Sequence, residues 1–580
     1  MGLYYITKKE ELDILNVLDS CKVIGVDLET MGKNGLIPQQ SNIRLLQIGT
    51  ASDRFVIDLK LLDLPQKIID LLNDNRITKI FHNAKFDLKH LYHHFGFFPT
   101  PVFCTFLASR IISSGNPHHR HSLGAVLERF LDQTIDKTLQ QSDWSGKLSD
   151  EQIDYAARDV EFLVPLYREM SEQIRQLKMK KISQLEFRTI EPVAKMELKG
   201  IHLDQPQWKQ LISTYETEMA SIEEELSHLL TDDSLLPGFN SINLNSHEQV
   251  RRALIKRGYR LTSTSEKELK ALQGDDDVIT KLLRYRHVSR ILKSTLCSFQ
   301  EAILPETGRV HPNYFQIASA SGRFSCSDPN IQQVPREKEI RAAFTPVEGY
   351  LYIVADYSQV ELRVAAGLSG DPVMLKAYKE RQDLHILTAA LTTGKAYNEV
   401  DKEERQAAKA INFGLIYAMG PKGLQLSAKQ SYGVTMTLSQ AEEFHARFFN
   451  SYSGIQRWHR ELEAFAKKRR YIRTASGRIR RYLSDDIHIT ELFNVPVQGT
   501  AAEALKAALC IFYKACIRRN LDAQPVAIIH DEIIVEVLSS QAQETRAVLT
   551  AAMIEGANWL VPNIPFEVDA TIATSWADKV

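Results

Sequence analysis

Two distant parts of the sequence each contain an apolar, strand-like run that leads into acidic residues. In the segment KVIGVDLET the apolar run ends in Asp27 and Glu29, and the segment YLYIVAD ends in Asp356. Residues at positions i and i+2 of a strand project from the same face, so Asp27 and Glu29 can share one cation. A carboxylate at the exposed end of a strand is also placed to hold a metal ion. The pattern predicts mixed α and β structure with two acidic sites.

The chain has 580 residues, which is too long for one hydrophobic core, and its length suggests about four domain-sized units. The net charge of −1 by itself disfavours a nucleic-acid binder, but with 71 basic residues the distribution of charge decides. Six scattered cysteines without a C-x-x-C pair argue against a zinc module or a disulfide framework. There is no long apolar run and no leader signal. We therefore expect no membrane partner and an intracellular location, cytoplasmic or nucleoid-associated, or in the host cytoplasm for a viral protein.

Two further acids of the first part fall on predicted helices. The segment ITKIFHNAKFD gives a short strand, a turn at His82 and Asn83, and a helix that carries Asp87. A later helix begins at a capping signal at Ser149 and carries Tyr155 and Asp159 one turn apart on one face. Hard cations prefer carboxylate oxygens, and two ions about 3.5–4 Å apart can cleave a phosphodiester. A single acid is more often a solvated surface residue, so the prediction rests on the ordered set.

The motifs D-x-E-T, N-A-K-F-D and Y-x-x-x-D, in this order, resemble the three exonuclease motifs of the DnaQ-like proofreading family. The resemblance implies an RNase H-like 3′→5′ exonuclease domain over residues 1–185. It implies that Tyr155 orients the attacking water and that four acids bind metal, namely Asp27, Glu29, Asp87 and Asp159. All five positions are filled, which favours an active exonuclease over a degenerate structural domain.

The remaining sequence, 186–580, starts with a helix that we expect to stop at Gly200. Two long amphipathic helices are predicted at 206–232 and 278–303, separated by FNSINLNSHEQV and a loop that contains Gly and Ser. Such a charged helical pair alone is more often a bundle or coiled-coil segment than a DNA clamp.

Acidic residues recur in two segments of this second part. After Asp356, Ser358-x-x-Glu361 opens a helix, and the local pattern is at least as consistent with a capping box as with a binding role. Two β-like runs flank His530, Asp531 and Glu532, which predicts a hairpin with the acids at its tip. We expect this tip to pair with Asp356.

A predicted helix between these segments, DKEERQAAKAINFGLIYAMG, carries Arg405, Lys409, Phe413 and Tyr417 at intervals of four. Steps of four drift by only about 40° on a helix of 3.6 residues per turn. One face therefore presents two cations and then two rings, which suits the triphosphate and the base and sugar of a nucleotide. The rings alone would indicate ordinary packing, and the cations on the same stripe argue against that.

These three segments resemble motifs A, B and C of family-A DNA polymerases. Further matches are ASGRFSCSDPNIQQVP, GDPVMLKAY followed by DLHILTA, RTASGRIRR, and NVPVQGTAAEALK. The resemblance implies a multidomain α/β and α+β fold in which the exonuclease domain precedes a right-hand polymerase at 186–580. The expected subdomains are a thumb at about 205–305, a palm at about 306–370 and 482–580, and fingers at about 371–481. The arrangement resembles that of the large fragment of polymerase I-type enzymes, and we expect no 5′ nuclease domain.

The resemblance implies template-directed DNA synthesis from dNTPs on a primer 3′ end, with proofreading. The implied cofactor is Mg²⁺, two ions per active site, with Mn²⁺ as an alternative. Expected partners are primer-template DNA and dNTPs, with the chain as a monomer and no processivity partner specified by the sequence.

The implied roles divide by chemistry. Asp356 and Asp531 bind the metals, and Glu532 assists nearby. His385, Arg405 and Lys409 contact the triphosphate, and Lys409 is placed to protonate the leaving group. Phe413 stacks on the incoming nucleotide, Tyr417 with Glu361 closes the sugar pocket, and Gln359 belongs to the same site. The residues expected to contact DNA are Arg323, Asn330, Gln332, Asn494, Gln498 and His530.

Two positions depart from the family pattern: Gln333 stands where Asn is usual, and Thr490 where Arg is common. They put duplex contacts in doubt, and the basic run at 467–481 is a candidate for compensating phosphate contacts. The competing interpretations are a single-subunit RNA polymerase-like enzyme, an inactive DNA-binding protein and a dedicated nuclease. Glu361 and the exonuclease motifs favour DNA synthesis over RNA synthesis. The intact acids argue against an inactive DNA-binding protein, and the polymerase motifs argue against a dedicated nuclease.

Overall fold

The computed structural model describes the chain in two compact units, and the residues described are 2–136, 138–139, 142–230, 242–272, 274, 277–484 and 487–579. The first unit comprises Met1–Lys199, Tyr314–Cys326 and Ile353–Ile572. The second comprises Gly200–Asn313, Ser327–Tyr352 and Ala573–Val580. In these ranges no helix is long and apolar enough to cross a membrane.

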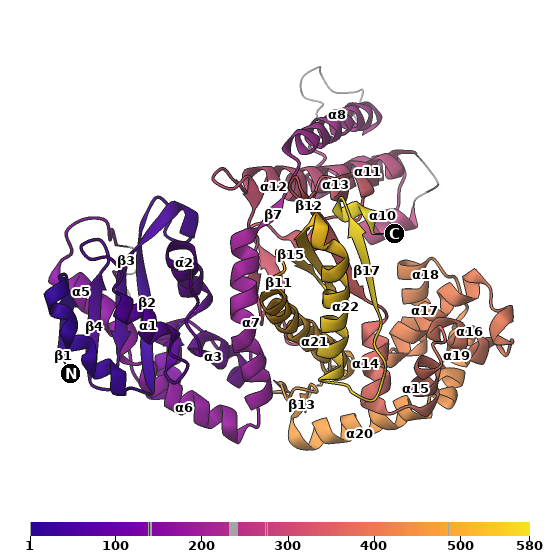
Figure 1. Cartoon of the computed structure of the whole chain (residues 1–580). Helices are drawn as coiled ribbons and strands as arrows, with labels where there is room; N and C mark the ends of the chain where they lie inside the picture. The colour runs from indigo at the N-terminus through magenta and orange to yellow at the C-terminus, as the bar shows by residue number, and fades with distance from the viewer. Residues whose placement is uncertain are drawn as a thin grey trace. The chain divides into compact units, whose positions relative to one another are not determined.

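A six-stranded mixed sheet forms the N-terminal part of the first unit, in the order β1-β4-β3-β2-β5-β6 (Figure 1). Its strands are β1 (Gly2–Ile6), β2 (Val23–Gly32), β3 (Ser41–Gly49), β4 (Asp53–Asp58), β5 (Thr78–Phe81) and β6 (Val102–Cys104). Strand β3 is antiparallel to both neighbours, whereas β1 with β4, β2 with β5 and β5 with β6 are parallel. The strand that carries Asp27 and Glu29 does not end at the acids but continues to Gly32, with a β-bulge after Glu29.

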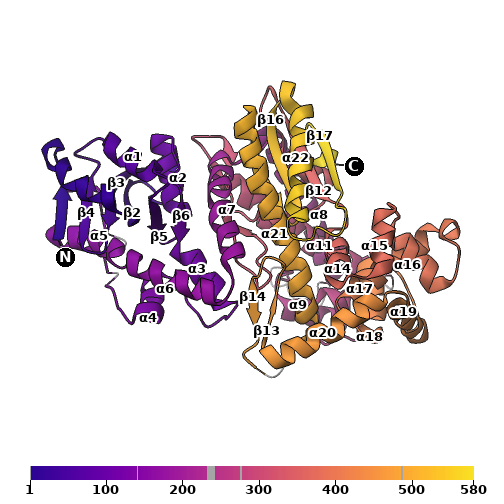
Figure 2. The same cartoon turned by 60° about the horizontal axis from the view of Figure 1, so that its bottom comes forward.

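Helices cover both sides of this sheet. Figure 2 shows α1 and α2 on one side and α5 and α6 on the other. The helices of this part are α1 (Gln66–Asn73), α2 (Lys85–Phe95), α3 (Thr105–Ser113), α4 (Leu123–Leu131), α5 (Asp150–Glu161) and α6 (Leu163–Gln176), with 3₁₀ turns at Lys9–Ser20 and Pro38–Gln40. The predicted capping box at Ser149 is confirmed, because its hydroxyl accepts from the backbone N–H of Gln152, whose side chain accepts in return from the N–H of Ser149.

Helix α7 (Lys180–Lys199) follows and packs against both α2 and α21. It ends at Gly200, whose φ of +64° suits a residue without a side chain, so the predicted stop is confirmed. The expected domain boundary near 185 lies inside α7, and the whole of this helix belongs to the first unit.

A second sheet has the strand order β15-β16-β12-β17. Its strands are β12 (Tyr350–Tyr357), β15 (Ala523–Ile529), β16 (Glu532–Leu538) and β17 (Val568–Ala573). Strands β15 and β16 form the predicted antiparallel hairpin, closed by the pair Ile529 and Glu532. Helices α21 (Ile489–Arg519) and α22 (Ala542–Asn558) pack against each other beside this sheet.

A helical group and a short ribbon complete the first unit. The helices are α14 (Val360–Ser369), α15 (Pro372–Lys379), α16 (Leu384–Thr393), α17 (Lys402–Ile416), α18 (Pro421–Tyr432), α19 (Leu438–Ser451) and α20 (Ser453–Arg469). The ribbon pairs β13 (Tyr471–Arg473) with β14 (Ile479–Arg481). A further two-stranded pairing joins β10 (Asn313–Phe315) to β11 (Ser325–Ser327). Strand β12 followed by α14 confirms the predicted strand–acid–helix order around Asp356.

The second unit is mainly helical. Its helices are α8 (Gln205–Leu230), α9 (His247–Lys256), α10 (Glu266–Ala271), α11 (Asp277–Ile291), α12 (Ser298–Glu301) and α13 (Lys338–Ala342), with a π-helical turn at Leu292–Cys297 and a small sheet β7-β9-β8 (Ile201–His202, Arg309–Val310, Ile303–Leu304). The predicted helix 206–232 matches α8, and its last two positions lie outside the described residues. The predicted helix 278–303 matches α11 to α12.

The expectation that FNSINLNSHEQV only separates two helices is wrong in its second half. Ser246 accepts a hydrogen bond from the backbone N–H of Gln249 and so caps α9, which begins at His247. Residues 239–241 of that segment lie outside the described residues. The buried Val250 and Leu254 pack α9 into the same core as α8 and α11. This tertiary packing stabilises a helix that the local turn-forming residues did not predict.

Candidate active sites

Three carboxylates converge on the N-terminal sheet, and with Asp87 they are called here the N-terminal acidic site. Asp27 and Glu29 lie on β2, and Asp159 lies on α5, which packs against β2, β3 and β4. One ligand oxygen from each of the three lies within 4.8 Å of the others. Carboxylates this close repel one another unless a cation is bound between them, and oxygen-only ligands suit a hard divalent cation.

Asp87 completes this site from the first turn of α2 and is only 1% exposed. Burial, followed by the negative charges of Asp27 and Glu29, raises the pKa of its carboxyl well above the usual range. Neither of its carboxylate oxygens makes a hydrogen bond of ordinary geometry with the described residues. Asn83, in the left-handed conformation with φ of 64°, makes the turn that starts α2 at this point. A buried acid that faces two other acids fits the role of a cation ligand.

Tyr155 lies on α5 one turn before Asp159 and is 5% exposed. Its ring packs near Trp144, with ring centroids 6.1 Å apart. Burial and then the charges of Asp159 and Glu29 raise the pKa of the hydroxyl, which therefore stays protonated and able to donate a hydrogen bond. This is the state in which it can orient a water at the acids.

A second pair of acids meets at the other sheet, and Asp356 and Asp531 are called here the C-terminal acidic site. Asp356 is the next-to-last residue of β12, and Asp531 lies in the two-residue turn of the β15–β16 hairpin. Burial and then the negative charge of Asp356 raise the pKa of Asp531 to about 6, so the two carboxylates interact electrostatically. Each lies at a strand end, as the sequence predicted.

The neighbours of Asp531 differ from each other. His530 is exposed and adopts a φ of +58°, which makes the hairpin turn. Glu532 is buried at the first position of β16. Among the described residues, the only group of three acids, histidines or cysteines with ligand atoms all within 4.8 Å is Asp27, Glu29 and Asp159, so Glu532 does not form such a group with Asp356 and Asp531.

Helix α17 carries the predicted stripe of Arg405, Lys409 and Phe413, and Tyr417 follows its last residue. Arg405 donates twice to Oδ2 of Asp383, at 3.0 Å from Nε and 2.7 Å from Nη2. Asp383 also caps α16 by accepting from the backbone N–H of His385 at 2.8 Å. One carboxylate therefore joins the start of α16 to the cationic end of the stripe.

His385 is buried beneath this stripe and is 3% exposed. The Asn412 amide and the His385 Nδ1 are 3.0 Å apart, and the ring centroids of His385 and Phe413 are 6.1 Å apart. Burial lowers the pKa of His385 to about 4, so the imidazole is neutral near pH 7. The expected contact between His385 and a triphosphate stays a prediction.

Glu361 accepts hydrogen bonds from two donors, a tyrosine hydroxyl and an arginine guanidinium. Tyr417 donates its hydroxyl to Oε2, and Arg323 donates Nη2 to Oε1. A side-chain hydrogen bond from Gln498 also acts on the Tyr417 hydroxyl, whose pKa is raised by burial and then by the charge of Glu361. Glu361 with Tyr417 and Arg323 is called here the Glu361 cluster.

The capping-box interpretation of Ser358 and Glu361 is wrong. The cap residue of α14 is Gln359, with φ of +53° and no side-chain capping hydrogen bond. The side chain of Gln359 instead accepts from the Tyr378 hydroxyl at 3.1 Å. Because Gln359 takes the left-handed turn, Glu361 is free to point toward Tyr417 and not back along its own helix.

The other residues expected to contact DNA lie on two different units. Asn494 is half-buried on α21, and its Oδ1 has no hydrogen-bond partner in the described chain. Asn330 caps a 3₁₀ turn, Ile331–Gln333, of the second unit by accepting from the backbone N–H of Gln332. Their contacts with DNA stay predictions. In the basic run, Arg478 is 4% exposed and paired with two glutamates, which makes it unavailable for a phosphate.

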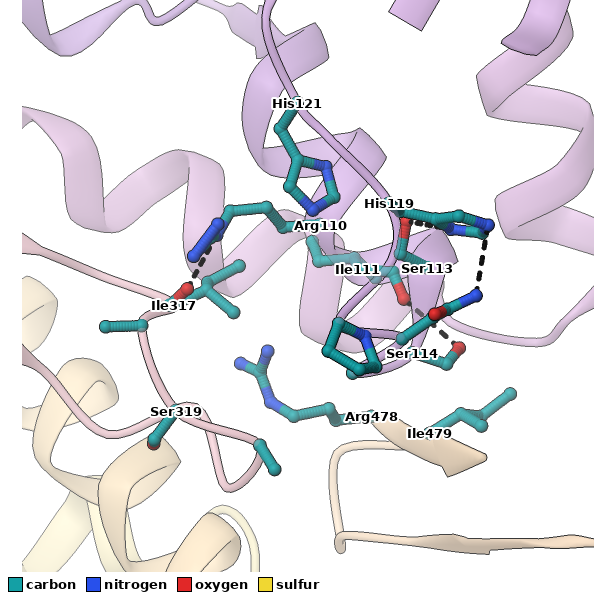
Figure 3. A pocket seen from close by; sticks show the side chains of 15 residues that line it. Arg110, Ile111, Ser113, Ser114, His119, His121, Ile317, Ser319, Arg478 and Ile479 are labelled. Atoms are coloured by element: carbon teal, nitrogen blue, oxygen red, sulfur yellow. Dashed lines mark hydrogen bonds between the residues drawn. The ribbon is translucent and has the colours of Figure 1, made fainter. Parts of the chain in front are cut away.

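A cavity of about 260 Å³ lies in the first unit, lined by residues that come from neither acidic site (Figure 3). Arg110 of α3 donates from Nε to the carbonyl of Ile317 at 2.6 Å across this cavity. Arg478 lies on the opposite wall of the same space. The cavity thus borders one side of the segment that leads to Arg323.

Two functional neighbours were missed from the sequence. Asp383 directly precedes a helix, and that position was a usable capping signal. Lys506 is the last residue of the matching segment NVPVQGTAAEALK, but nothing in that segment indicates that its ammonium donates to the carbonyl of Gly322, just before Arg323.

Two family models together match most of the chain. The model of the 3′-5′ exonuclease family matches residues 4–175, and the model of DNA polymerase family A matches residues 205–578. Both regions contain the acids described above.

Relatives agree with the models. The chain is 32% identical to DNA polymerase I of Aquifex aeolicus over 99% of this chain and 100% of that protein. It is 34% identical to the thermostable DNA polymerase I of Thermus filiformis over 67% of this chain and 47% of that one, so it spans about half the length of that relative.

A solved structure shares the fold, with a TM-score of 0.85, 24% identity and full coverage of both chains. It is the POL domain of Pol1 from M. smegmatis in complex with DNA primer-template and dNTP. Family A polymerase and exonuclease domains generally use divalent metal ions, which fits the oxygen-only ligands at both acidic sites. On these matches the chain belongs to DNA polymerase family A and carries a 3′-5′ exonuclease domain.

Proposed function

We propose that the chain extends a DNA primer with dNTPs at the C-terminal acidic site and removes mispaired 3′ ends at the N-terminal acidic site. The observation that carries this proposal is the presence of two acidic sites on two different sheets, in each of which the negative charge of one acid raises the pKa of another. Two Mg²⁺ ions at each site, replaceable by Mn²⁺, would activate the attacking oxygen and stabilise the leaving oxygen.

The residues around the C-terminal acidic site support the division of roles. Asp356 and Asp531 would hold the cations, and Arg405 and Lys409 would present positive charge on one face of α17 toward a triphosphate. Lys409 can donate a proton to the departing pyrophosphate. Phe413 and Tyr417 continue the same face with rings that suit a base and a sugar. The Glu361 cluster closes the side on which a ribose 2′-hydroxyl would lie, which supports DNA over RNA synthesis.

The residues around the N-terminal acidic site support hydrolysis. The four carboxylates would hold the cations, and the protonated Tyr155 hydroxyl would orient the attacking water. We propose that the exonuclease domain ends within α7. The order of the helices and strands after it supports a polymerase domain made of thumb, palm and fingers. DNA and dNTPs as substrates favour a site of action inside the cell, in the cytoplasm or with the nucleoid. We also propose that the chain acts as a monomer.

Primer extension on a defined template tests the proposal. With Mg²⁺ and all four dNTPs the primer should reach full length, and omission of one dNTP should stop extension before the first complementary template base. Extension that ignores the template or needs no divalent ion would contradict it.

A further inference from the structure

Four charged side chains are buried together between α7, α21 and the β13–β14 ribbon. They are Glu186, Arg478, Glu503 and Lys506, each at most 4% exposed. Arg478 donates to Glu186 and to Glu503, the latter at 3.2 Å. Lys506 donates to Glu186 Oε1 at 2.6 Å. Two cations thus balance two anions, which is how buried charges are tolerated.

Lys506 uses its other two donor positions on backbone carbonyls. Its ammonium donates to the carbonyl of Gln316 at 2.6 Å and to the carbonyl of Gly322 at 2.8 Å. The Gln316 side chain in turn donates to Glu186 Oε2 at 2.9 Å. One ion pair, between Lys506 and Glu186, therefore fixes both ends of the segment 316–322.

The next residue in the chain is Arg323, which bonds Glu361. Both sequence neighbours of Arg323 are held by the buried cluster. The Lys506 ammonium lies 5.0 Å from the centre of the Phe324 ring. A Cβ on Gly322 would lie 2.6 Å from Cζ of Arg478, and its φ is +76°, so this position accommodates only glycine.

The Arg323 guanidinium has little other support within the segment. Its backbone N–H donates to the Ser319 hydroxyl at 3.2 Å, which fixes the turn but not the side chain. Its side chain is 38% exposed, and Glu361 is the acceptor that orients it. The position of Arg323 against Glu361 is therefore set mainly by where the backbone of 322–324 is anchored.

We propose that Lys506, together with Glu186, is a positioning residue for sugar discrimination: it anchors segment 316–322 and thereby holds Arg323 against Glu361. This inference rests on the proposed DNA synthesis. The alternative is that the buried ions serve folding alone, in which case removing them changes stability without changing which sugar is accepted.

The test measures the ratio of rNTP to dNTP incorporation in single-nucleotide extension. Lys506→Met alone would leave Arg478 as the one cation facing both Glu186 and Glu503 in this cluster, so the main variant combines Lys506→Met with Glu186→Gln to keep the charges balanced. Gln316→Met is a milder variant that removes only the amide link to Glu186. Thermal unfolding establishes that each variant is folded.

Lys79 provides a matched control. It is a fully buried lysine of the N-terminal sheet whose ammonium donates to three carbonyls, of Asp74, Ile77 and Thr100. It has no connection through these bonds to segment 316–322. Lys79→Met should lower thermal stability while leaving the ribonucleotide ratio unchanged.

The expected result is a rise in the ratio of at least about threefold for Lys506→Met with Glu186→Gln, the scale of one lost hydrogen bond, and a smaller rise for Gln316→Met. Arg323→Ala should raise the ratio as well. Adding the Lys506 and Glu186 changes to Arg323→Ala should give no further rise, because they act through Arg323.

An unchanged ratio in the folded variants, or effects that add fully in the Arg323→Ala background, would overturn the proposal. Failure of the unmodified chain to extend a primer with dNTPs would instead contradict the proposed function. The two failures are therefore distinguishable in one assay.

Discussion

The hydroxyl of Tyr417 donates to the carboxylate of Glu361 across 56 residues of sequence, and Arg323 donates to the other oxygen of the same carboxylate. Glu361 is therefore held by tertiary contacts and not by its own helix. The two hydrogen bonds fix the position of the Glu361 carboxylate, five residues after Asp356 in the sequence.

Replacing Glu361 by Ala should raise the rNTP to dNTP incorporation ratio by roughly tenfold or more, which corresponds to ~1.4 kcal/mol of lost discrimination. The reason is that the substitution removes the Glu361 carboxylate, with which we expect the 2′-hydroxyl of a ribonucleotide to clash. Arg323 and Tyr417 lose an acceptor, so stability should fall by about 1–3 kcal/mol. Glu361→Gln, which keeps the size of the side chain, is the control and should retain most of the discrimination. If Glu361→Ala loses stability but keeps the wild-type ratio of rNTP to dNTP incorporation, residues other than Glu361 must exclude ribonucleotides.

Phe413→Tyr should weaken discrimination against dideoxynucleotides. Phe413 is half-buried on the stripe of α17 that we propose faces the nucleotide, and a Tyr hydroxyl there would replace the missing 3′-hydroxyl near the triphosphate. One such hydrogen bond corresponds to about fivefold. Competition between ddNTP and dNTP in primer extension measures the effect. An unchanged ratio of ddNTP to dNTP incorporation would show that Phe413 does not contact the sugar of the incoming nucleotide.

Substitutions of Asp383 should distinguish its two roles, the cap of α16 and the ion pair with Arg405. Asp383→Asn keeps an acceptor for the cap of α16 but loses the ion pair with Arg405, so the KM for dNTP should rise while stability is retained. Asp383→Ala loses both and should also lower stability by about 1 kcal/mol. Steady-state kinetics and thermal unfolding together read the two effects. An unchanged KM in Asp383→Asn would show that Arg405 needs no orienting partner.

His459 should contribute a pH dependence to stability. It is 8% exposed, its Nε2 lies 2.8 Å from the carbonyl of Ile416, and burial lowers its pKa from 6.5 to about 4. Between these values the unfolded chain binds a proton that the folded chain does not, so stability rises with pH across this window and falls as pH drops through it.

The unfolding midpoint from pH 4 to 7 therefore tests this prediction. His459→Gln should show a shallower loss on the acid side, by up to about 3 kcal/mol at the low end. The exposed His118, replaced by Gln, serves as the control and should keep the wild-type slope. Equal slopes for all three proteins would contradict the prediction.

The sequence predicted most of the elements around the acids, because local patterns encode them. The apolar run of β2, the capping box at Ser149 and the apolar runs around Asp531 each depend on residues within one turn or strand. The wrong expectations also have local causes. Ser358 and Glu361 match a capping box, but the left-handed Gln359 shifts the start of α14.

Long-range partners left no local signal. Lys506 and Glu186 are 320 residues apart, and Arg405 meets Asp383 from another helix. The burial of His385 was missed for the same reason, since its cover comes from α17. Family resemblance supplied residue identities but not these contacts.

The most direct test of the account is to separate the two activities on one mispaired primer-template. Asp27→Ala with Glu29→Ala should abolish removal of the mispaired 3′ nucleotide and leave extension of a paired primer near the wild-type rate. Asp531→Ala should leave removal intact and slow extension by at least roughly a hundredfold, since a metal ligand supplies several kcal/mol of charge stabilisation. Loss of both activities in either variant, or near-normal extension by Asp531→Ala, would contradict two independent acidic sites.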